Sequence, residues 1–242
     1  MLHRAVFWLM LPISAVQGLA LRRKALRLPG ASGERQGSIG RGDALHVLAI
    51  GDSIIDGVGA GRMEDALPVQ FARALAEKMN RCVHWRVEGQ TGFAIDDVIR
   101  RLADISTIEQ PDIVLISVGV NDVTGLSTTS HWRSRLVVML DLLNERWPEA
   151  QTLFAGLPPM SLFPLPPQPL RFSLGLRAAT MDSIAAETIA AYPNVEHVPT
   201  RVNPGDHSFC EDGFHPSAES CTLWARELAS IETRRDSNER KY

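Results

Sequence analysis

Residues 112–119 read DIVLISVG, the most strongly apolar strand-like run in the body of the chain. The run is short, and it is apolar on both of the faces that a β-strand would present. That pattern is typical of a strand whose two faces are both covered by other layers. A strand of this kind belongs inside a parallel sheet that lies between two layers of helices.

Strands and helices alternate on either side of this stretch. Further runs of the strand type occupy residues 45–50, 83–88, 151–157 and 194–199. Helical spacing of apolar residues is found over 66–80, 94–105, 131–147, 174–192 and 217–231. This alternation predicts an α/β fold, a three-layer α/β/α sandwich with a parallel five-stranded sheet.

Polar or glycine-rich turns follow four of the predicted strands. In a sheet of this type, ligands gather at the carboxyl ends of the strands. We therefore expect the four turns to meet at one edge of the sheet. They read GDS (51–53), GQTG (89–92), GVND (119–122) and LPPM (157–160).

Ser53 in the first turn is the candidate nucleophile. A serine hydroxyl needs a base, a group that orients the base, and donors for the developing oxyanion. Among the seven histidines, His215 lies in EDGFHPS, with Asp212 three residues before it. This spacing allows the Asp212 carboxylate to accept a hydrogen bond from Nδ1 of His215 and to direct Nε2 towards a serine. The alternative for this stretch is a surface loop with a capping aspartate.

The candidate oxyanion donors are the side-chain amide of Asn121, the N–H of Gly92 and the N–H of Ser53. Each follows a predicted strand directly, so each is expected at the same edge of the sheet. Structural alternatives remain open. Asn121 is also suited to a turn in which it bonds its own backbone, and Gly92 to a turn with positive φ.

These four blocks together resemble the SGNH hydrolases, also called GDSL lipases or esterases. The blocks occur in the family's order, and the resemblance covers about residues 45 to 230. It implies a flavodoxin-like fold and hydrolysis of carboxylic acyl esters of the lipid, lysophospholipid or acetylated-sugar class. It also implies that Ser53, Asp212 and His215 are catalytic and that Ser53, Gly92 and Asn121 form the oxyanion hole.

The chain departs from the commonest family pattern in two places. It reads GDSIIDG where GDSL is frequent, and Thr91-Gly92 where Ser-Gly is usual. Neither departure removes a catalytic group. Two alternatives remain, an acyl transferase on the same scaffold and a non-catalytic flavodoxin-like ligand-binding module. GVGAG (57–61) lacks the spacing of a dinucleotide-binding loop, and the GxSxG motif of α/β-hydrolases is absent around Ser53.

Composition narrows the possible partners. The chain has 242 residues, of which 45% are hydrophobic and 22% are charged, and its formal net charge is −3. These values indicate one soluble globular domain and no nucleic-acid partner. Cys82, Cys210 and Cys221 form no CxxC pair, so neither a zinc site nor another metal or cofactor is expected. Free buried thiols are favoured, and a Cys210–Cys221 disulfide is the alternative for an exported protein.

The ends of the chain differ from its body. We divide it into a hydrophobic segment (1–27), a linker (28–43), the hydrolase domain (44–231) and a polar tail (232–242). The apolar run 5–21 is consistent with a secretory signal, with a membrane anchor, or with an amphipathic or core-packing N-terminal helix. Membrane association or export to the periplasm or the extracellular space is therefore expected rather than a free cytoplasmic location.

A proline-rich segment, PPMSLFPLPPQPLRF (158–172), follows the predicted strand 151–157. Prolines make such a segment stiff and extended. Two interpretations are open. The segment is either a wall that receives an acyl chain or a rigid wrap that packs on a neighbouring helix.

Overall fold

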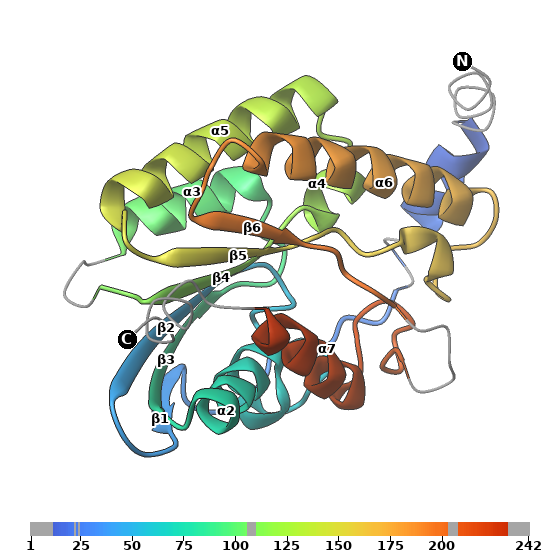
Figure 1. The fold of residues 1–242 in the computed structure, drawn as a ribbon. Helices are drawn as coiled ribbons and strands as arrows, with labels where there is room; N and C mark the ends of the chain where they lie inside the picture. The colour runs from blue at the N-terminus through green and yellow to red at the C-terminus, as the bar shows by residue number, and fades with distance from the viewer. Residues whose placement is uncertain (1–11, 22, 24, 106–109, 203–207, 232–242) are drawn as a thin grey trace.

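A six-stranded sheet forms the centre of the molecule. The computed structural model describes residues 12–21, 23, 25–105, 110–202 and 208–231, and Figure 1 traces the chain through it. The strand order is β1-β3-β2-β4-β5-β6. The strands are β1 (Gln36–Ile39), β2 (Ala44–Gly51), β3 (Cys82–Gly89), β4 (Ile113–Ser117), β5 (Gln151–Ala155) and β6 (Val195–Val198).

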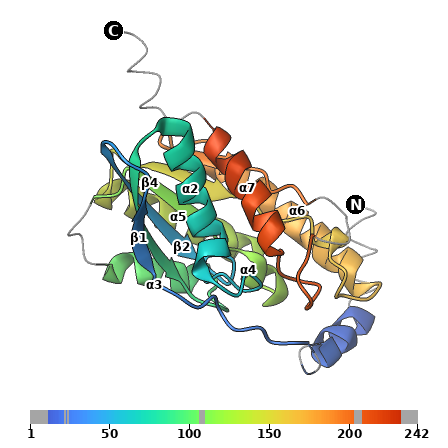
Figure 2. The same ribbon diagram turned by 90° about the horizontal axis from the view of Figure 1, so that it is seen from below.

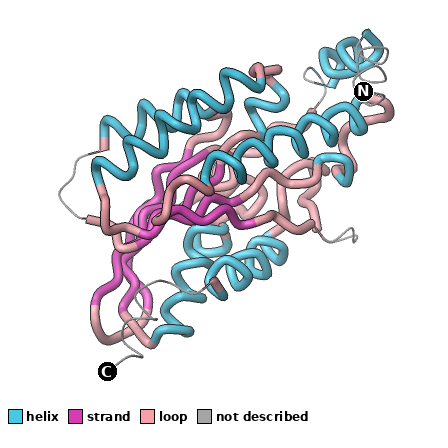
Figure 3. Tube along the Cα trace, turned by 45° about the horizontal axis from the view of Figure 1, so that its top comes forward, coloured by secondary structure: helices cyan, strands magenta, loops and turns pink. Residues whose placement is uncertain are grey.

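Helices cover both faces of this sheet, as Figures 1 and 3 show. α3, α5 and α6 lie on one face, with the short α4 beside them, and α2 and α7 lie on the other. The helices are α2 (Leu67–Met79), α3 (Ile95–Asp104), α4 (Val120–Thr124), α5 (Thr129–Arg146), α6 (Leu170–Ile189) and α7 (Ala218–Ser230), and two short 3₁₀ turns are η1 (Met63–Asp65) and η2 (Met160–Leu162).

The side chains of β2 explain why two helical layers are needed. Successive residues of a strand point to opposite faces of the sheet. Leu48 and Ile50 pack in the core beneath α3, α5 and α6. Val47 and Ala49 pack in the second core, beneath α2 and α7. The α/β fold with helices on both faces of the sheet is therefore confirmed.

The predicted strand count is corrected from five to six. All five expected strands are present and pair in parallel, and the additional strand β1 pairs with β3 in the antiparallel direction. β1 lies within residues 28–43, the stretch that we expected to be a linker. Its sequence, QGSI, carries no apolar run, and three of its four residues are exposed. Backbone pairing with the edge of β3 forms this strand, and hydrophobic patterning does not reveal such pairing.

The strand register aligns the ends of the parallel strands, and therefore the turns that follow them. Gly51 at the end of β2 pairs with Gly89 on one side and with Ser117 on the other. Ser117 in turn pairs with Ala155, and Ala155 with Val198. The chain therefore leaves these five parallel strands at one edge of the sheet.

A helix over residues 12–21 rests against the beginning of α6, as Figure 2 shows. The Gln17 side chain donates to the carbonyl of Gln168 at 2.8 Å and accepts from the N–H of Leu170 at 3.1 Å. The hydroxyls of Ser14 and Ser173 lie 3.2 Å apart. None of the helices in the described ranges is long and apolar enough to cross a bilayer. Residues 5–11 of the apolar run lie outside the described residues.

Candidate active site

Ser53, His215 and Asp212 form one hydrogen-bonded line at the carboxyl edge of the sheet. Nε2 of His215 lies 2.9 Å from Oγ of Ser53, and Nδ1 of His215 lies 2.6 Å from Oδ2 of Asp212. Ser53 stands on the turn after β2, whereas the other two residues precede α7. The arrangement has the geometry of a nucleophile, a base and a group that orients the base.

Asp212 is buried and well supplied with donors. Its Oδ1 accepts from the N–H of Phe214 at 2.8 Å, from the N–H of His215 at 2.9 Å and from the thiol of Cys210 at 3.0 Å. Burial raises the pKa of Asp212, but the hydrogen bonds from Cys210, His215 and the backbone outweigh it and hold the pKa below its ordinary value. An ionised Asp212 favours the imidazole tautomer that carries its proton on Nδ1.

The turn that carries Asp212 and His215 is closed by its own backbone. The N–H of Cys210 donates to the carbonyl of His215 at 2.9 Å, and the N–H of Gly213 donates to the carbonyl of Cys210 at 3.0 Å. Gly213 has φ of +64°, a conformation that glycine adopts without strain. The hydroxyl of Ser217 then caps α7 by accepting from the N–H of Ser220 at 3.2 Å.

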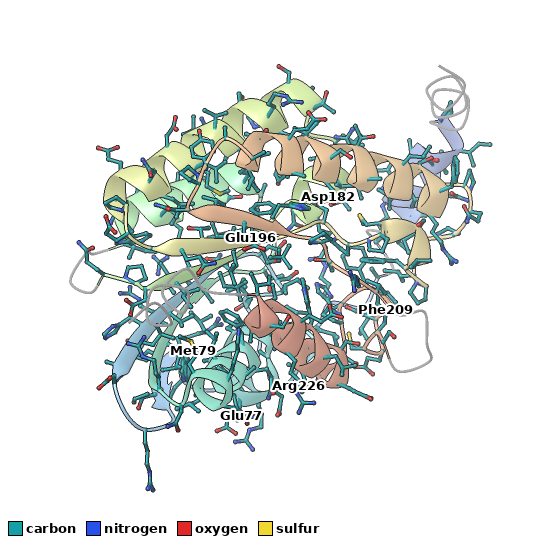
Figure 4. The ribbon with its side chains drawn as sticks, viewed as in Figure 1. Glu77, Met79, Asp182, Glu196, Phe209 and Arg226 are labelled. Carbon is teal, nitrogen blue, oxygen red and sulfur yellow. The ribbon has the colours of Figure 1, made fainter. Side chains whose placement is uncertain are left out.

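The proline-rich segment supports this turn from outside. The N–H of Leu165 donates to the carbonyl of Gly213 at 3.0 Å. The buried ring of Phe163 meets the rings of Phe209 and Phe214 edge-on, with centroids 5.2 Å and 5.1 Å away. Figure 4 labels Phe209 on the chain that leads into α7. The segment therefore packs both on the turn that carries His215 and, through η2, on the neighbouring helix α6, and Phe163 also lines the adjoining pocket.

The expected oxyanion donors come from three successive turns. Asn121 lies in α4, and its Nδ2 donates to the carbonyl of Phe93 at 2.9 Å, which ties it to the turn that contains Gly92. A primary amide has a second N–H, which remains for a ligand. Within the described residues, the N–H groups of Ser53 and Gly92 donate to no other protein atom.

Asp52, next to Ser53, is a titratable group whose role the sequence does not reveal. It is 1% exposed, and its Oδ1 accepts from the N–H of Ile54 at 3.1 Å. Burial, aided by the nearby Asp122 carboxylate, raises its pKa to about 7. Asp122 is also buried, and burial raises its pKa as well. The Asp122 carboxylate joins α4 to the start of α3 by accepting from the N–H of Ile95 at 3.0 Å.

A pocket of about 260 Å³ opens beside Ser53 and His215. It lies between the ends of β4 and β5 on one side and α7 on the other, and most of its walls are apolar. The apolar lining residues are Ile54, Val118, Val120, Ala155, Leu157, Pro158, Phe163, Val202, Phe209, Phe214, Pro216, Leu223 and Trp224. Polar and charged groups also line it, including Arg201 and, on α7, Ser220 and Glu227. Such a mixture is common in sites that bind apolar ligands with a few polar contacts.

Sequence reasoning missed three residues that contact this site. Cys210 donates to Asp212, and Asp56 and Arg35 support the turn before Gly92. The one sequence signal for such a partner is Asp56 itself, a carboxylate that directly follows the apolar pair Ile54-Ile55 in GDSIIDG. Cys210 and Cys221 are both free thiols.

Comparison with known proteins points to one family. A family model described as the GDSL-like lipase/acylhydrolase family matches residues 49–221. A GDSL-like esterase from Mycobacterium tuberculosis is 26% identical over 189 residues, which cover 75% of this chain and 59% of that protein. The match thus spans less than two thirds of that relative's length.

Solved structures of the same kind share the fold. A lipase from a goat rumen metagenome superimposes with a TM-score of 0.66 at 20% identity, over 77% of this chain and 96% of the other. A psychrotrophic esterase from Pseudoalteromonas gives 0.60 at 15% identity, over 81% and 97% of the two chains. A lipase/acylhydrolase from Enterococcus faecalis gives 0.59 at 22% identity, over 81% and 96%. At these identities, the likeness establishes the fold.

Proposed function

Because the chain belongs to the GDSL-like lipase/acylhydrolase family, we propose that it is a serine esterase that hydrolyses carboxylic acyl esters through an acyl-enzyme on Ser53. One observation carries this proposal. Ser53, His215 and Asp212 are joined by two hydrogen bonds of 2.9 Å and 2.6 Å in the order that nucleophilic catalysis needs.

The proposed reaction has two halves. His215 takes the proton of the Ser53 hydroxyl as Oγ attacks the ester carbonyl, and the negative charge develops on the carbonyl oxygen. The N–H groups of Ser53, Gly92 and Asn121 stabilise this oxyanion. The C–O bond to the alcohol then breaks, and the alcohol leaves with the proton from His215. A water molecule, deprotonated by His215, cleaves the acyl-enzyme in the same way and releases the carboxylic acid.

The pocket suggests which esters are used. Apolar walls next to Ser53 suit the acyl chain better than a charged alcohol. An apolar cavity of ~150 Å³ holds one benzene molecule, so a volume near 260 Å³ has room for roughly ten carbon atoms. Esters of medium-length acyl groups are therefore the proposed substrates.

A panel of p-nitrophenyl esters with acyl chains from two to sixteen carbons tests this function. Wild-type protein should release p-nitrophenolate, with the highest kcat/KM between about six and ten carbons, and Ser53→Ala should release none above background. A wild-type protein that cleaves no ester in the panel would contradict the esterase. Activity that rises steadily to the longest chain would contradict only the chain length.

We also propose that the helix over residues 12–21 lies on a membrane surface. Ile13, Val16 and Leu19 are spaced three residues apart, and their exposed fractions are 57%, 68% and 61%. They therefore form an apolar stripe, whereas Gln17 and Ser14 face the protein. Exposed Arg23 and Arg27 follow the stripe, as suits a helix that binds an anionic lipid surface.

Sedimentation with vesicles of anionic phospholipid tests the membrane contact. The full-length protein should sediment with the vesicles. Replacement of Ile13, Val16 and Leu19 by serine should greatly reduce the fraction of protein that does so. The matched control places serine at Val137 and Val138 of α5, which are 38% and 40% exposed. Equal sedimentation of the stripe variant and wild-type protein would refute the membrane contact and leave the esterase proposal intact.

A further inference from the structure

Asp56 is a buried carboxylate that takes no part in the line from Ser53 to Asp212. It is 8% exposed, yet three donors reach it. Its Oδ2 accepts from both the N–H of Thr91, at 3.0 Å, and the Thr91 hydroxyl, at 2.5 Å. Its Oδ1 accepts from Nη2 of Arg35 at 2.5 Å. So many partners on one carboxylate indicate that its place is closely defined.

Asp56 belongs to the turn that carries the nucleophile. Its N–H donates to the carbonyl of Asp52 at 2.9 Å, in the same turn where the N–H of Val58 donates to the carbonyl of Ser53 at 3.0 Å. The surrounding chain leaves no room for it to move. A Cβ atom at Gly30 would lie 2.6 Å from Oδ2 of Asp56, and one at Gly89 would lie 2.4 Å from its backbone nitrogen.

Thr91 immediately precedes Gly92 in the second turn. The N–H of Gly92 belongs to the peptide unit between these two residues, so the orientation of Thr91 sets the direction of that N–H. The other side of Gly92 is also held, because the carbonyl of Phe93 accepts from Asn121 at 2.9 Å. Gly92 itself has φ of +92°, and a Cβ atom there would meet nothing within 4 Å. Packing around Gly92 therefore does not fix its conformation. The hydrogen bonds of its two chain neighbours, Thr91 and Phe93, do so.

We propose that Thr91 and Asp56 are positioning residues, which fix the Gly92 N–H towards the oxyanion of an ester bound at Ser53. This inference rests on the proposed esterase activity and adds a role to residues outside the catalytic line. Asp56 fixes Thr91 relative to the turn that holds Ser53, so nucleophile and oxyanion donor keep a constant separation. Such preorganisation lowers the barrier because the donor does not reorient as charge develops.

Arg35 is the third group that holds Asp56 in place, by a hydrogen bond to its Oδ1. Burial raises the pKa of Asp56, but the hydrogen bonds from Thr91 and Arg35 outweigh it and lower the pKa below its ordinary value. The carboxylate is thus ionised at neutral pH and accepts from both residues. Arg35 immediately precedes β1, and its carbonyl accepts from the N–H of Val87 at 2.7 Å, so β3 holds it in place.

Thr91→Val tests the inference, because valine keeps the shape of threonine and removes only the hydroxyl. We expect kcat for a p-nitrophenyl ester to fall about tenfold, with KM within twofold of wild type. Thr91→Ser keeps a hydroxyl and should retain most of kcat. A trifluoromethyl ketone, which forms a tetrahedral oxyanion with the serine, should bind Thr91→Val more weakly by about the same factor as kcat/KM falls.

Controls separate positioning from stability. Thr128→Val removes another threonine hydroxyl, which accepts from the N–H of His131 at 3.1 Å and caps α5. It should lower the melting temperature without changing kcat. Should Thr91→Val fail to fold, Thr91→Ala is measured against the same criteria. A Thr91 variant with wild-type kcat and wild-type ketone affinity would overturn the inference while leaving the esterase intact. A wild-type protein without esterase activity would instead refute the proposed function, and this inference with it.

Discussion

Nε2 of His215 lies 2.9 Å from Oγ of Ser53, although 162 positions separate the two residues in the chain. Ser53 lies on the turn that follows the first parallel strand, β2, and His215 precedes the last helix. The sheet register and the turn before α7 bring them together. This contact makes the hydroxyl of Ser53 the one expected to react with serine-directed reagents.

A fluorophosphonate should therefore label the protein once, on Ser53. The phosphonate mimics the tetrahedral intermediate, and His215 is placed to take the proton of the attacking hydroxyl. Mass spectrometry of peptides from labelled protein would locate the adduct. Ser117 also lines the pocket, so Ser117→Ala is the matched control and should still be labelled. Labelling that persists in Ser53→Ala would contradict the assignment.

Asp212→Asn should keep the fold and lower kcat by roughly 10³- to 10⁴-fold, since an amide favours the wrong imidazole tautomer. Steady-state kinetics on a p-nitrophenyl ester measures this loss, and circular dichroism checks the fold. The neighbouring Glu211 is exposed, and Glu211→Gln should have little effect. If both variants kept full activity, His215 would need no carboxylate partner.

Asn121→Ala should lower kcat about a hundredfold, because one oxyanion donor is typically worth ~3 kcal/mol. It also removes the hydrogen bond that holds the carbonyl of Phe93, so part of the loss will come from a looser Gly92 turn. Comparing Asn121→Ala, Thr91→Val and the double variant separates these contributions. Losses that multiply indicate independent effects, whereas a double variant no worse than Asn121→Ala indicates a shared one.

The raised pKa of Asp52 predicts how stability depends on pH. In the folded chain this pKa is about 7, against 3.8 for an ordinary aspartate. Between these values the folded state holds a proton that the unfolded state has lost, so stability falls as pH rises from about 4 to 7. Asp52→Asn cannot titrate and should lack this contribution.

Urea denaturation at pH 5 and pH 8 measures the difference. Asp52→Asn should gain stability over wild type by a few kcal/mol more at pH 8 than at pH 5. Asp104→Asn, at an exposed position of α3, is the control and should show no such gain. Equal pH dependence in wild-type protein and Asp52→Asn would contradict the assignment of this pKa.

Truncation should show that residues 28–43 belong to the folded domain. A chain of residues 28–231 keeps β1 and Arg35, whereas 44–231 exposes the edge of β3 and leaves Asp56 without Arg35. We expect the longer form to be monodisperse, and the shorter form to be less stable or to aggregate. Gel filtration and urea denaturation of the two forms decide this. Equal stability would mean that β1 contributes nothing to the domain.

Local patterns in the sequence predicted much of the fold. The five parallel strands and most of the helices were predicted from apolar runs and helical spacing. A strand that is buried on both faces must be apolar along its length, and a helix that covers a sheet must be apolar along one side. Boundaries were less accurate. α6 begins at Leu170, four residues before the predicted start, and Pro169 is its N-cap residue. α4 was not predicted at all, since five residues carry no periodicity.

The candidate residues of the site could also be predicted from sequence motifs and their spacing. Ser53, Gly92 and Asn121 follow strands, and Asp212 precedes His215 at a spacing that allows a hydrogen bond. The groups that support these residues became visible only in the folded structure. β1, the Asp56–Thr91 contact and the packing of Phe163 on Phe214 depend on segments far apart in the chain. Such contacts arise from backbone pairing and from the meeting of turns, and neither leaves a periodic pattern in the residues that take part.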